Sequence, residues 1–319
     1  MKKIILITIG LILLCTGCSM PNQTVENKIN VVCTVFPQYD FVREIAKDRV
    51  NVQMLLPPGG EAHSYEPSPK DIIALKEADL FIAIGGESEH WAMHLLEGSE
   101  LKGTPTLLLA DVVTTYAEEV TEGMEGSGHG HEHSEKCEHD EHEAEFDEHI
   151  WTAPQNAVLM CRAISRALCD ADPDNSEFYQ NNTDVYCNRL TDLDSEFKKA
   201  AADAKRNTVI FGDRFPMRYL IEAMGLQYYA AFPGCSSKTE PSAKTLAFLT
   251  DKVKNDNIPV VFYMDYSDAR IADAISRETH AKAIRLYSCH NLSKEDLSEG
   301  ETYLSLMQKN LSALKEALN

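Results

Sequence analysis

The stretch NVVCTVFPQYDFVREIAKDRVNVQMLLPPGG, residues 30–60, decides the fold class. Residues 31–35 form a short apolar run rich in β-branched side chains, which predicts a strand. Residues 38–46 carry apolar side chains at helical spacing. A second apolar run at residues 50–56 ends in two prolines and two glycines, which predict a turn. Strand, helix and strand in this order predict a parallel sheet with helices on its faces.

The same alternation continues along the rest of the chain. Helices are predicted at residues 69–78 and 87–96, and strands at residues 80–84 and 106–109. After a helix at residues 154–169, the pattern repeats with strands at residues 208–211, 226–232, 260–264 and 283–287 and helices at residues 215–224, 242–255, 269–279 and 301–318.

A long helical pattern separates the two halves. Residues 175–205 contain no proline or glycine, and at about 1.5 Å per residue they would span over 40 Å. A chain of this length exceeds the size at which one core usually suffices, about 250 residues. We therefore predict an N-terminal lobe at residues 29–170, a connecting helix at residues 171–206 and a C-terminal lobe at residues 207–319.

The N-terminus has the pattern of an export signal. Two lysines precede an apolar run at residues 4–14, which is too short for a membrane span of about 20 residues. The small residues that follow end at Cys18, a pattern that resembles the bacterial lipoprotein signal. We predict a signal peptide at residues 1–17, a lipidated Cys18 and a tether at residues 18–28. An ordinary cleaved signal with an incidental cysteine is the alternative.

Charge and cysteine content narrow the function classes. The formal net charge of −20 argues against nucleic acid as a partner and favours a cationic partner or plain solubility. Of nine cysteines, seven follow the signal and none of these forms a CxxC pair. An odd number leaves at least one thiol unpaired within the chain. A bridge between Cys235 and Cys289 stays open.

Residues 126–145 interrupt the alternation of strands and helices. The segment is mostly Gly, Glu, Asp and His, and such a composition cannot fill a core. We predict a mobile loop within the N-terminal lobe. Because imidazole is a common metal ligand, we expect the histidines of this loop to gather metal ions near a binding site or to sense their supply. A solvated linker is the alternative reading. The imidazoles of this auxiliary loop are His129, His131, His133, His139 and His142.

Two further histidines lie in longer motifs. His63 is part of PGGEAHSYEPSP, residues 58–69, and His149 is part of DEHIWTAPQNA, residues 147–157. Both motifs lie where loops leave predicted strands, and open α/β sheets bind ligands at the carboxyl ends of their strands. A neutral imidazole is a common ligand of zinc and related ions.

These motifs, in this order around an acidic His-rich segment, resemble the metal-binding solute-binding lipoproteins of bacterial ABC importers, the zinc and manganese family. The closing YLSLMQKNL, residues 303–311, also fits, so the likeness runs from about residue 30 to the C-terminus. The resemblance implies an α/β fold of two (β/α) lobes with parallel-type sheets, joined by one long helix, with the metal in the interlobe cleft.

The resemblance also implies a function. The chain is expected to be an extracytoplasmic, lipid-anchored protein of the cell membrane that binds Zn²⁺, with Mn²⁺ as a possible cargo. It would deliver the ion to an ABC permease and its ATPase. The expected protein is a monomer without catalytic activity, and it binds no nucleic acid.

By motif position the resemblance makes His63 and His149 ligands from the first lobe. The family normally adds a histidine after the first strand of the second lobe and a carboxylate near the last strand. Here the corresponding positions hold Gly212, followed by Asp213, and His290. We interpret this as an exchange, in which His290 supplies the imidazole and Asp213 the carboxylate.

The fourth coordination position stays open at this point. Asp213, Glu61 or a water could occupy it, and Cys289 is a softer alternative that would favour zinc. Glu66 and Asp147 are candidates for orienting the imidazoles, because they are close in sequence. A nitrogen-rich donor set favours zinc over manganese.

Two other functions compete with import. A secreted zinc hydrolase would need a general base and an open coordination position, but the sequence contains no HExxH, GxSxG or Gly-rich phosphate loop. A surface metal store or adhesin would use the His-rich segment as its functional part. Deletion of residues 126–145 would distinguish that protein from an importer component.

Overall fold

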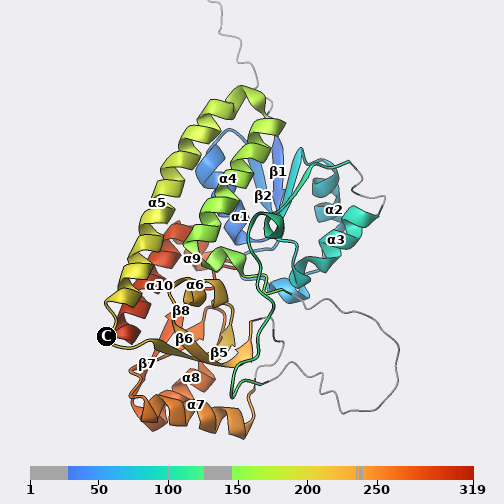
Figure 1. The fold of residues 1–319 in the computed structure, drawn as a ribbon. Helices are drawn as coiled ribbons and strands as arrows, with labels where there is room; N and C mark the ends of the chain where they lie inside the picture. The colour runs from blue at the N-terminus through green and yellow to red at the C-terminus, as the bar shows by residue number, and fades with distance from the viewer. Residues whose placement is uncertain (1–27, 99–100, 102, 126–145, 235, 237–239) are drawn as a thin grey trace, which may run out of the picture.

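The computed structural model shows two lobes, each built on a four-stranded parallel sheet (Figure 1). The predicted signal peptide, the tether up to residue 27, the lipidation site Cys18 and the five histidines of the auxiliary loop lie outside the described residues. The structure describes residues 28–98, 101, 103–125, 146–234, 236 and 240–319.

The first lobe follows the βαβ pattern of the sequence. Its strand order is β2-β1-β3-β4, and every neighbouring pair is parallel. The sides of the sheet are covered by helices, so that β3 is buried along its whole length. The elements of this lobe are β1 (Asn30–Cys33), α1 (Phe36–Ala46), β2 (Asn51–Met54), η1 (Ala62–Ser64), α2 (Pro69–Lys76), β3 (Leu80–Ala83), η2 (Glu87–Glu89), α3 (His90–Glu97), β4 (Thr106–Leu108) and η3 (Leu109–Val112).

The second lobe repeats the same topology. Its strand order is β6-β5-β7-β8, again with parallel pairs only. In both sheets the first strand of the lobe therefore lies in the second position. The elements of this lobe are β5 (Thr208–Phe215), α6 (Arg218–Ala223), β6 (Gln227–Pro233), α7 (Ala243–Asn255), β7 (Val260–Met264), α8 (Arg270–Thr279), β8 (Lys282–Leu286), α9 (Lys294–Glu299) and α10 (Tyr303–Leu318).

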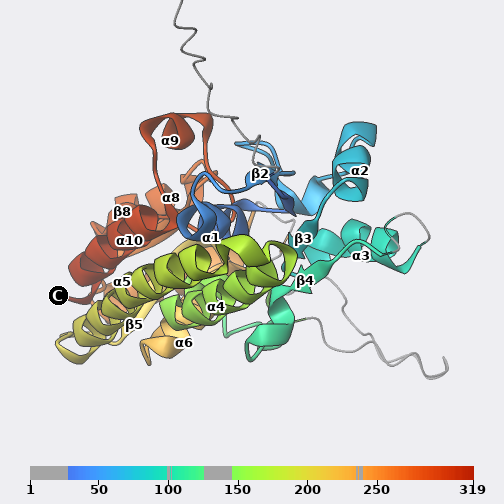
Figure 2. The same ribbon diagram turned by 90° about the horizontal axis from the view of Figure 1, so that it is seen from above.

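Helix α5 (Ser176–Ala202) runs along both lobes (Figure 1). Its 27 residues correspond to about 40 Å. It follows η4 (Ile150–Thr152), α4 (Pro154–Ala171) and η5 (Pro173–Asn175). It packs against α4, α1 and α10, and Figure 2 shows α4 and α5 side by side. Within the described part of the chain, no helix combines the length and apolar character that a membrane crossing needs.

One hydrophobic cluster extends through both lobes. Val31 of β1 and Phe262 of β7 belong to the same continuous cluster of buried side chains. The C-terminal helix α10 contributes to it, with Tyr303 and Leu314 fully buried. Because separating the lobes would expose part of this apolar surface to water, the core resists a wide opening.

Strand β5 differs from the prediction. The expected strand at residues 208–211 continues to Phe215, and the expected helix at residues 215–224 begins only at Arg218. The reason is the neighbouring strand: after an irregularity, Phe215 still pairs with Pro233 of β6. The extension places Asp213 within a strand, which decides what its carboxylate contacts.

Candidate metal centre

Segments far apart in the sequence supply the polar side chains of one pocket between the lobes. His63 lies in η1, which follows β2. Glu148 and His149 directly precede η4, and His290 follows β8. The loops after the parallel strands of both lobes thus meet in the crevice where open α/β sheets bind ligands.

Four of these side chains converge. His63, Glu148, His149 and His290 each offer one ligand atom, and these atoms lie within 4.8 Å of one another. The ring centroid of His290 lies 5.9 Å from that of His63 and 5.5 Å from that of His149. The structure therefore brings together the three histidines predicted from the sequence and adds Glu148.

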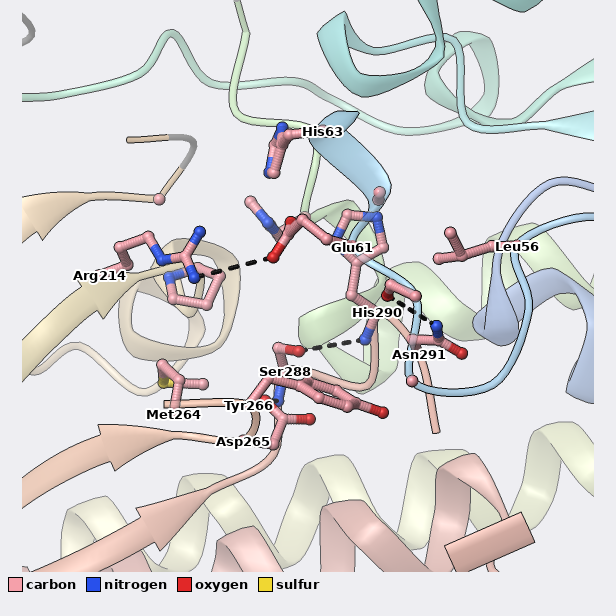
Figure 3. A pocket seen from close by; sticks show the side chains of 16 residues that line it. Leu56, Glu61, His63, Arg214, Met264, Asp265, Tyr266, Ser288, His290 and Asn291 are labelled. Carbon is pink, nitrogen blue, oxygen red and sulfur yellow. Dashed lines mark hydrogen bonds and ion pairs between the residues drawn. The ribbon is translucent and has the colours of Figure 1, made fainter. Parts of the chain in front are cut away.

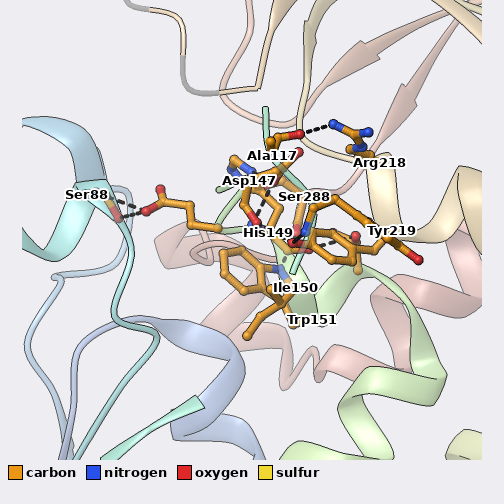
Figure 4. Close-up of polar contacts among 12 residues, drawn as sticks. Ser88, Ala117, Asp147, His149, Ile150, Trp151, Arg218, Tyr219 and Ser288 are labelled. Carbon is orange, nitrogen blue, oxygen red and sulfur yellow. Dashed lines mark hydrogen bonds and ion pairs between the residues drawn. The ribbon is translucent and has the colours of Figure 1, made fainter. Parts of the chain in front are cut away.

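Asp147 orients the buried ring of His149 (Figure 4). Its Oδ1 accepts hydrogen bonds from Nδ1 of His149 at 2.8 Å and from the backbone N–H of the same residue at 2.9 Å. Engagement of Nδ1 leaves Nε2 as the free ring nitrogen of His149. Glu66, the other candidate for such a role, is exposed.

Glu148 is the residue that sequence reasoning missed. Its Oε2 accepts hydrogen bonds from the backbone N–H of Ser88 at 3.0 Å and from the Ser88 hydroxyl at 2.8 Å. Its Oε1 is buried without a hydrogen-bond partner and lies 3.8 Å from Nε2 of His63. A buried carboxylate oxygen without a partner is costly, and a cation among the imidazoles would satisfy it. The available signal was an acidic residue directly before His149.

The loop that carries His290 is bonded to the first lobe. The indole N–H of Trp151 donates to the backbone carbonyl of Ser288 at 2.8 Å. The side-chain amide of Asn291 donates to two backbone carbonyls of the 57–60 turn, both at 2.9 Å. These bonds fix His290 relative to the first-lobe ligands, although it follows a strand of the second lobe.

Burial and neighbouring charges set the protonation of the imidazoles. Burial lowers the pKa of His290 well below its ordinary 6.5, and the nearby His149 and His63 lower it further. Burial also lowers the pKa of His63. For His149, burial works in the same direction, but the carboxylates around it, Asp147 first and then Glu148, together outweigh burial and the pKa is raised. At neutral pH the rings of His63 and His290 are therefore uncharged, as metal ligation requires.

An ion pair lies at the pocket beside the imidazoles (Figure 3). The cavity measures about 90 Å³, and Glu61 and Arg214 are among its lining residues. Nη2 of Arg214 lies 3.9 Å from Oε2 of Glu61, so a second-lobe cation faces a first-lobe carboxylate. Glu61 is thus placed near the site but outside the converging group of four.

Asp213 lies outside the converging group as well. Its Oδ1 accepts from the backbone N–H of Arg214 at 2.8 Å, and its Oδ2 accepts from the backbone N–H of Met264 at 3.0 Å. Both oxygens are thus engaged, Oδ1 within β5 and Oδ2 in a bond that joins β5 to β7. Cys289 is a buried free thiol that is also outside the group, and Cys235 lies beyond the described residues.

The fold and the pocket define a two-lobed α/β protein that presents three imidazoles and one carboxylate between its lobes, the donor types of a zinc-like site. The chain belongs to the family described as zinc-uptake complex component A periplasmic, ZnuA, whose sequence model matches residues 31–317.

Curated relatives agree with this family. The zinc-binding lipoprotein AdcA of Streptococcus pneumoniae (strain ATCC BAA-255 / R6) is 32% identical over 318 residues, which cover 99% of this chain and 61% of AdcA. The high-affinity zinc uptake system protein ZnuA of Bacillus subtilis (strain 168) is 34% identical over 292 residues, 92% of this chain and 88% of that protein. The chain thus spans about three fifths of AdcA and most of the Bacillus protein.

Solved structures share the fold. The Zn(II)-bound ZnuA-like domain of Streptococcus pneumoniae AdcA is 29% identical, with a TM-score of 0.73 over 91% of this chain and 99% of that domain. The metal-dependent lipoprotein YcdH of Bacillus subtilis is also 29% identical, with a TM-score of 0.75 over 91% of this chain and 99% of that one.

Proposed function

We propose that this chain captures one zinc ion outside the cytoplasm and delivers it to an ABC importer. The observation that carries the proposal is the convergence of His63, Glu148, His149 and His290, whose ligand atoms lie within 4.8 Å of one another. Membership in the ZnuA family supports transport as the purpose of this site. In this proposal the zinc ion is the transported substrate and not a resident cofactor, because the protein would release it to the transporter.

The donor set favours zinc. A tetrahedral zinc with bonds of about 2.0–2.1 Å would draw its ligand atoms to about 3.3 Å from one another. The ligand atoms of the pocket are within 4.8 Å, so small side-chain rotations suffice to close the site. Manganese takes more oxygen ligands than this group supplies, and Mn²⁺ is therefore the weaker candidate cargo.

We further propose the setting in which the protein works. The signal-like pattern of residues 1–18 supports lipid attachment at Cys18 to the cell membrane. The relative AdcA is named a lipoprotein. The partners would be an ABC permease and its ATPase, with the binding protein acting as a monomer. A net charge of −20 would attract cations to the protein and repel nucleic acid.

We infer that the site has no catalytic role. Catalytic zinc sites keep an open position for water or substrate beside their protein ligands. Four protein donors, as grouped here, would fill a tetrahedral zinc completely. A secreted hydrolase is therefore the less supported reading of the same residues.

The function is tested by zinc titration of the mature protein against a competing chelator. The wild type should bind one ion tightly, and the His63→Ala, His149→Ala double variant should lose this binding. The His90→Ala, His94→Ala double variant is the matched control, because both residues are exposed on α3. Equally tight zinc binding by the wild type and the His63→Ala, His149→Ala variant would refute the proposed site.

The His-rich segment supports a second candidate, a surface metal store. Its five imidazoles would bind several ions weakly. Deletion of residues 126–145 distinguishes the two functions, since an importer component keeps its single tight site and a store loses most of its capacity. The measured quantity is the number of zinc ions bound per chain at saturation.

A further inference from the structure

The two carboxylate oxygens of Glu148 have different surroundings. Oε2 is held by two donors of Ser88, the backbone N–H at 3.0 Å and the hydroxyl at 2.8 Å. Oε1 is buried, has no hydrogen-bond partner and faces His63 at 3.8 Å. Only one oxygen of this side chain is therefore free to bind a cation in the pocket.

Gly86 makes room for this arrangement. A Cβ atom at position 86 would lie 2.4 Å from Oε2 and 2.5 Å from the Cβ of Glu148, closer than real side chains approach. The backbone of Gly86, with φ −92° and ψ −173°, is extended and open to any residue. The glycine is thus required for the space that Glu148 occupies and not for its own conformation.

A buried polar chain fixes the turn that presents Ser88. The carboxylate of Glu89, which is 2% exposed, accepts from the backbone N–H of Gly85 at 2.8 Å and from the hydroxyl of Thr34. The side-chain amide of Gln38 donates to the same hydroxyl at 2.6 Å. Residues 85–89, here named the 85–89 turn, are therefore tied to the end of β1 and to α1 in the core of the first lobe.

We infer that the 85–89 turn is the element that determines which metal the pocket prefers. By occupying Oε2, Ser88 holds Glu148 as a one-oxygen donor, so that the site closes at four ligands. Four-coordination suits zinc, whereas larger oxygen-preferring ions gain from a carboxylate that binds through both oxygens. Ser88 is then a positioning residue that acts through Glu148. This inference rests on the proposed function, because it describes selectivity at the same site.

The test compares zinc and manganese affinities of the full-length mature protein. Ser88→Ala removes the hydroxyl, and Gly86→Ala pushes Glu148 away. Both should weaken zinc binding by about 10- to 100-fold, the range found when residues that orient metal ligands are lost. Ser88→Ala, which frees the second oxygen of Glu148, should also lower the ratio of zinc to manganese affinity. Gly86→Ala, which displaces the only carboxylate of the group, should not lower this ratio, because three imidazoles remain. Ser88→Thr keeps a hydroxyl, so its zinc affinity and its ratio of zinc to manganese affinity should be close to those of the wild type.

Two controls separate this effect from general damage to the pocket. Ser64→Ala removes an exposed hydroxyl next to His63, and Glu66→Gln neutralises an exposed carboxylate three residues after His63. Both should keep the wild-type ratio of zinc to manganese affinity. Circular dichroism checks that the Gly86→Ala and Ser88→Ala variants fold.

The absorption spectrum of bound Co²⁺ reports the coordination directly. The wild type should give the intense visible bands of a four-coordinate ion, and Ser88→Ala should weaken them. Unchanged spectra and affinities in folded Ser88→Ala and Gly86→Ala proteins would overturn the role of the turn while leaving zinc capture intact. A wild type that fails to bind zinc would instead refute the proposed function itself.

Discussion

The indole N–H of Trp151 donates a hydrogen bond of 2.8 Å to the backbone carbonyl of Ser288 (Figure 4). This bond joins the motif that contains His149 to the loop that contains His290. The Trp151 ring also lies 5.4 Å from the His149 ring and 4.9 Å from the His290 ring, centroid to centroid. One buried side chain thus supports the relative position of two ligands from different lobes.

Trp151→Phe should keep most of the apolar packing and remove the donor. The Ser288 carbonyl would then lack its partner, which should lower the free energy of unfolding by about 1–3 kcal/mol. Zinc affinity should fall as well, because the His290 loop gains freedom. Chemical denaturation and chelator competition measure the two effects. Trp91→Phe is the control, since Trp91 packs against Tyr65 in the first lobe, and equal losses in both variants would contradict the prediction.

Asp147→Asn should weaken zinc binding by about 10- to 100-fold. The carboxylate accepts from Nδ1 of His149 and keeps Nε2 available for the metal, whereas an amide orients the ring less well. Glu66→Gln should have no effect, because Glu66 is exposed. Zinc competition assays on both variants decide between these two candidates, and a larger loss for Glu66→Gln would reverse the assignment.

The sequence predicted most of the fold for a physical reason. Apolar runs, helical periodicity and turn residues are local signals, and they were sufficient to place two parallel-sheet lobes and a long helix. His63 and His149 were found because they lie in long motifs. Glu148 was not, because its interpretation depends on Ser88, which is 60 positions away in the chain and carries no local mark of that contact.

Asp213 was predicted as a ligand for a related reason, because local sequence did not reveal its contacts. The sequence placed it just after a strand, where a carboxylate would be free to turn toward the pocket. In the structure β5 continues past it to Phe215, because strand β6 keeps pairing at this level. Its oxygens are consequently used by the backbone N–H groups of Arg214 and Met264. Strand extension depends on a partner strand, which local sequence does not reveal.

Asp213→Ala distinguishes the two roles. If Asp213 braces the strands, the variant should lose about 1–3 kcal/mol of unfolding free energy, because buried N–H groups lose their acceptors. Zinc affinity should stay close to that of the wild type. Asp268→Ala, which removes an exposed carboxylate, should change neither quantity. A large loss of zinc affinity in a stable Asp213→Ala protein would restore the carboxylate to the ligand set.

Bound zinc should stabilise the folded chain. A ligand present at about 100 times its dissociation constant adds about 2.7 kcal/mol to the free energy of unfolding when it binds only the folded state. The midpoint temperature of thermal unfolding of the wild type should therefore rise when zinc is added and fall back when a chelator removes it. The His63→Ala, His149→Ala variant should show no such shift, and a shift of equal size would place the stabilising ion elsewhere.

Asp40 gives the metal-free protein a pH-dependent stability. Its side chain is 1% exposed and accepts from the backbone N–H of Tyr303 at 2.9 Å. Burial raises the pKa of Asp40 from 3.8 to about 6, and the bond from Tyr303 opposes this only in part. The folded state therefore holds a proton that the unfolded chain releases near pH 3.8. The stabilisation from that proton is complete below pH 3.8 and is lost as the pH rises through about 6.

Asp40→Asn should remove this dependence, because the amide cannot ionise. The wild type should lose up to about 3 kcal/mol relative to the variant as the pH rises from about 4 to about 7. Denaturant unfolding of both proteins in the presence of a chelator measures the difference without a contribution from bound metal. Asp256→Asn, at an exposed position, should follow the wild type at every pH. Parallel pH curves for wild type and Asp40→Asn would show that the buried carboxyl is ionised throughout and that the charge of Arg43, 3.7 Å away, offsets its burial.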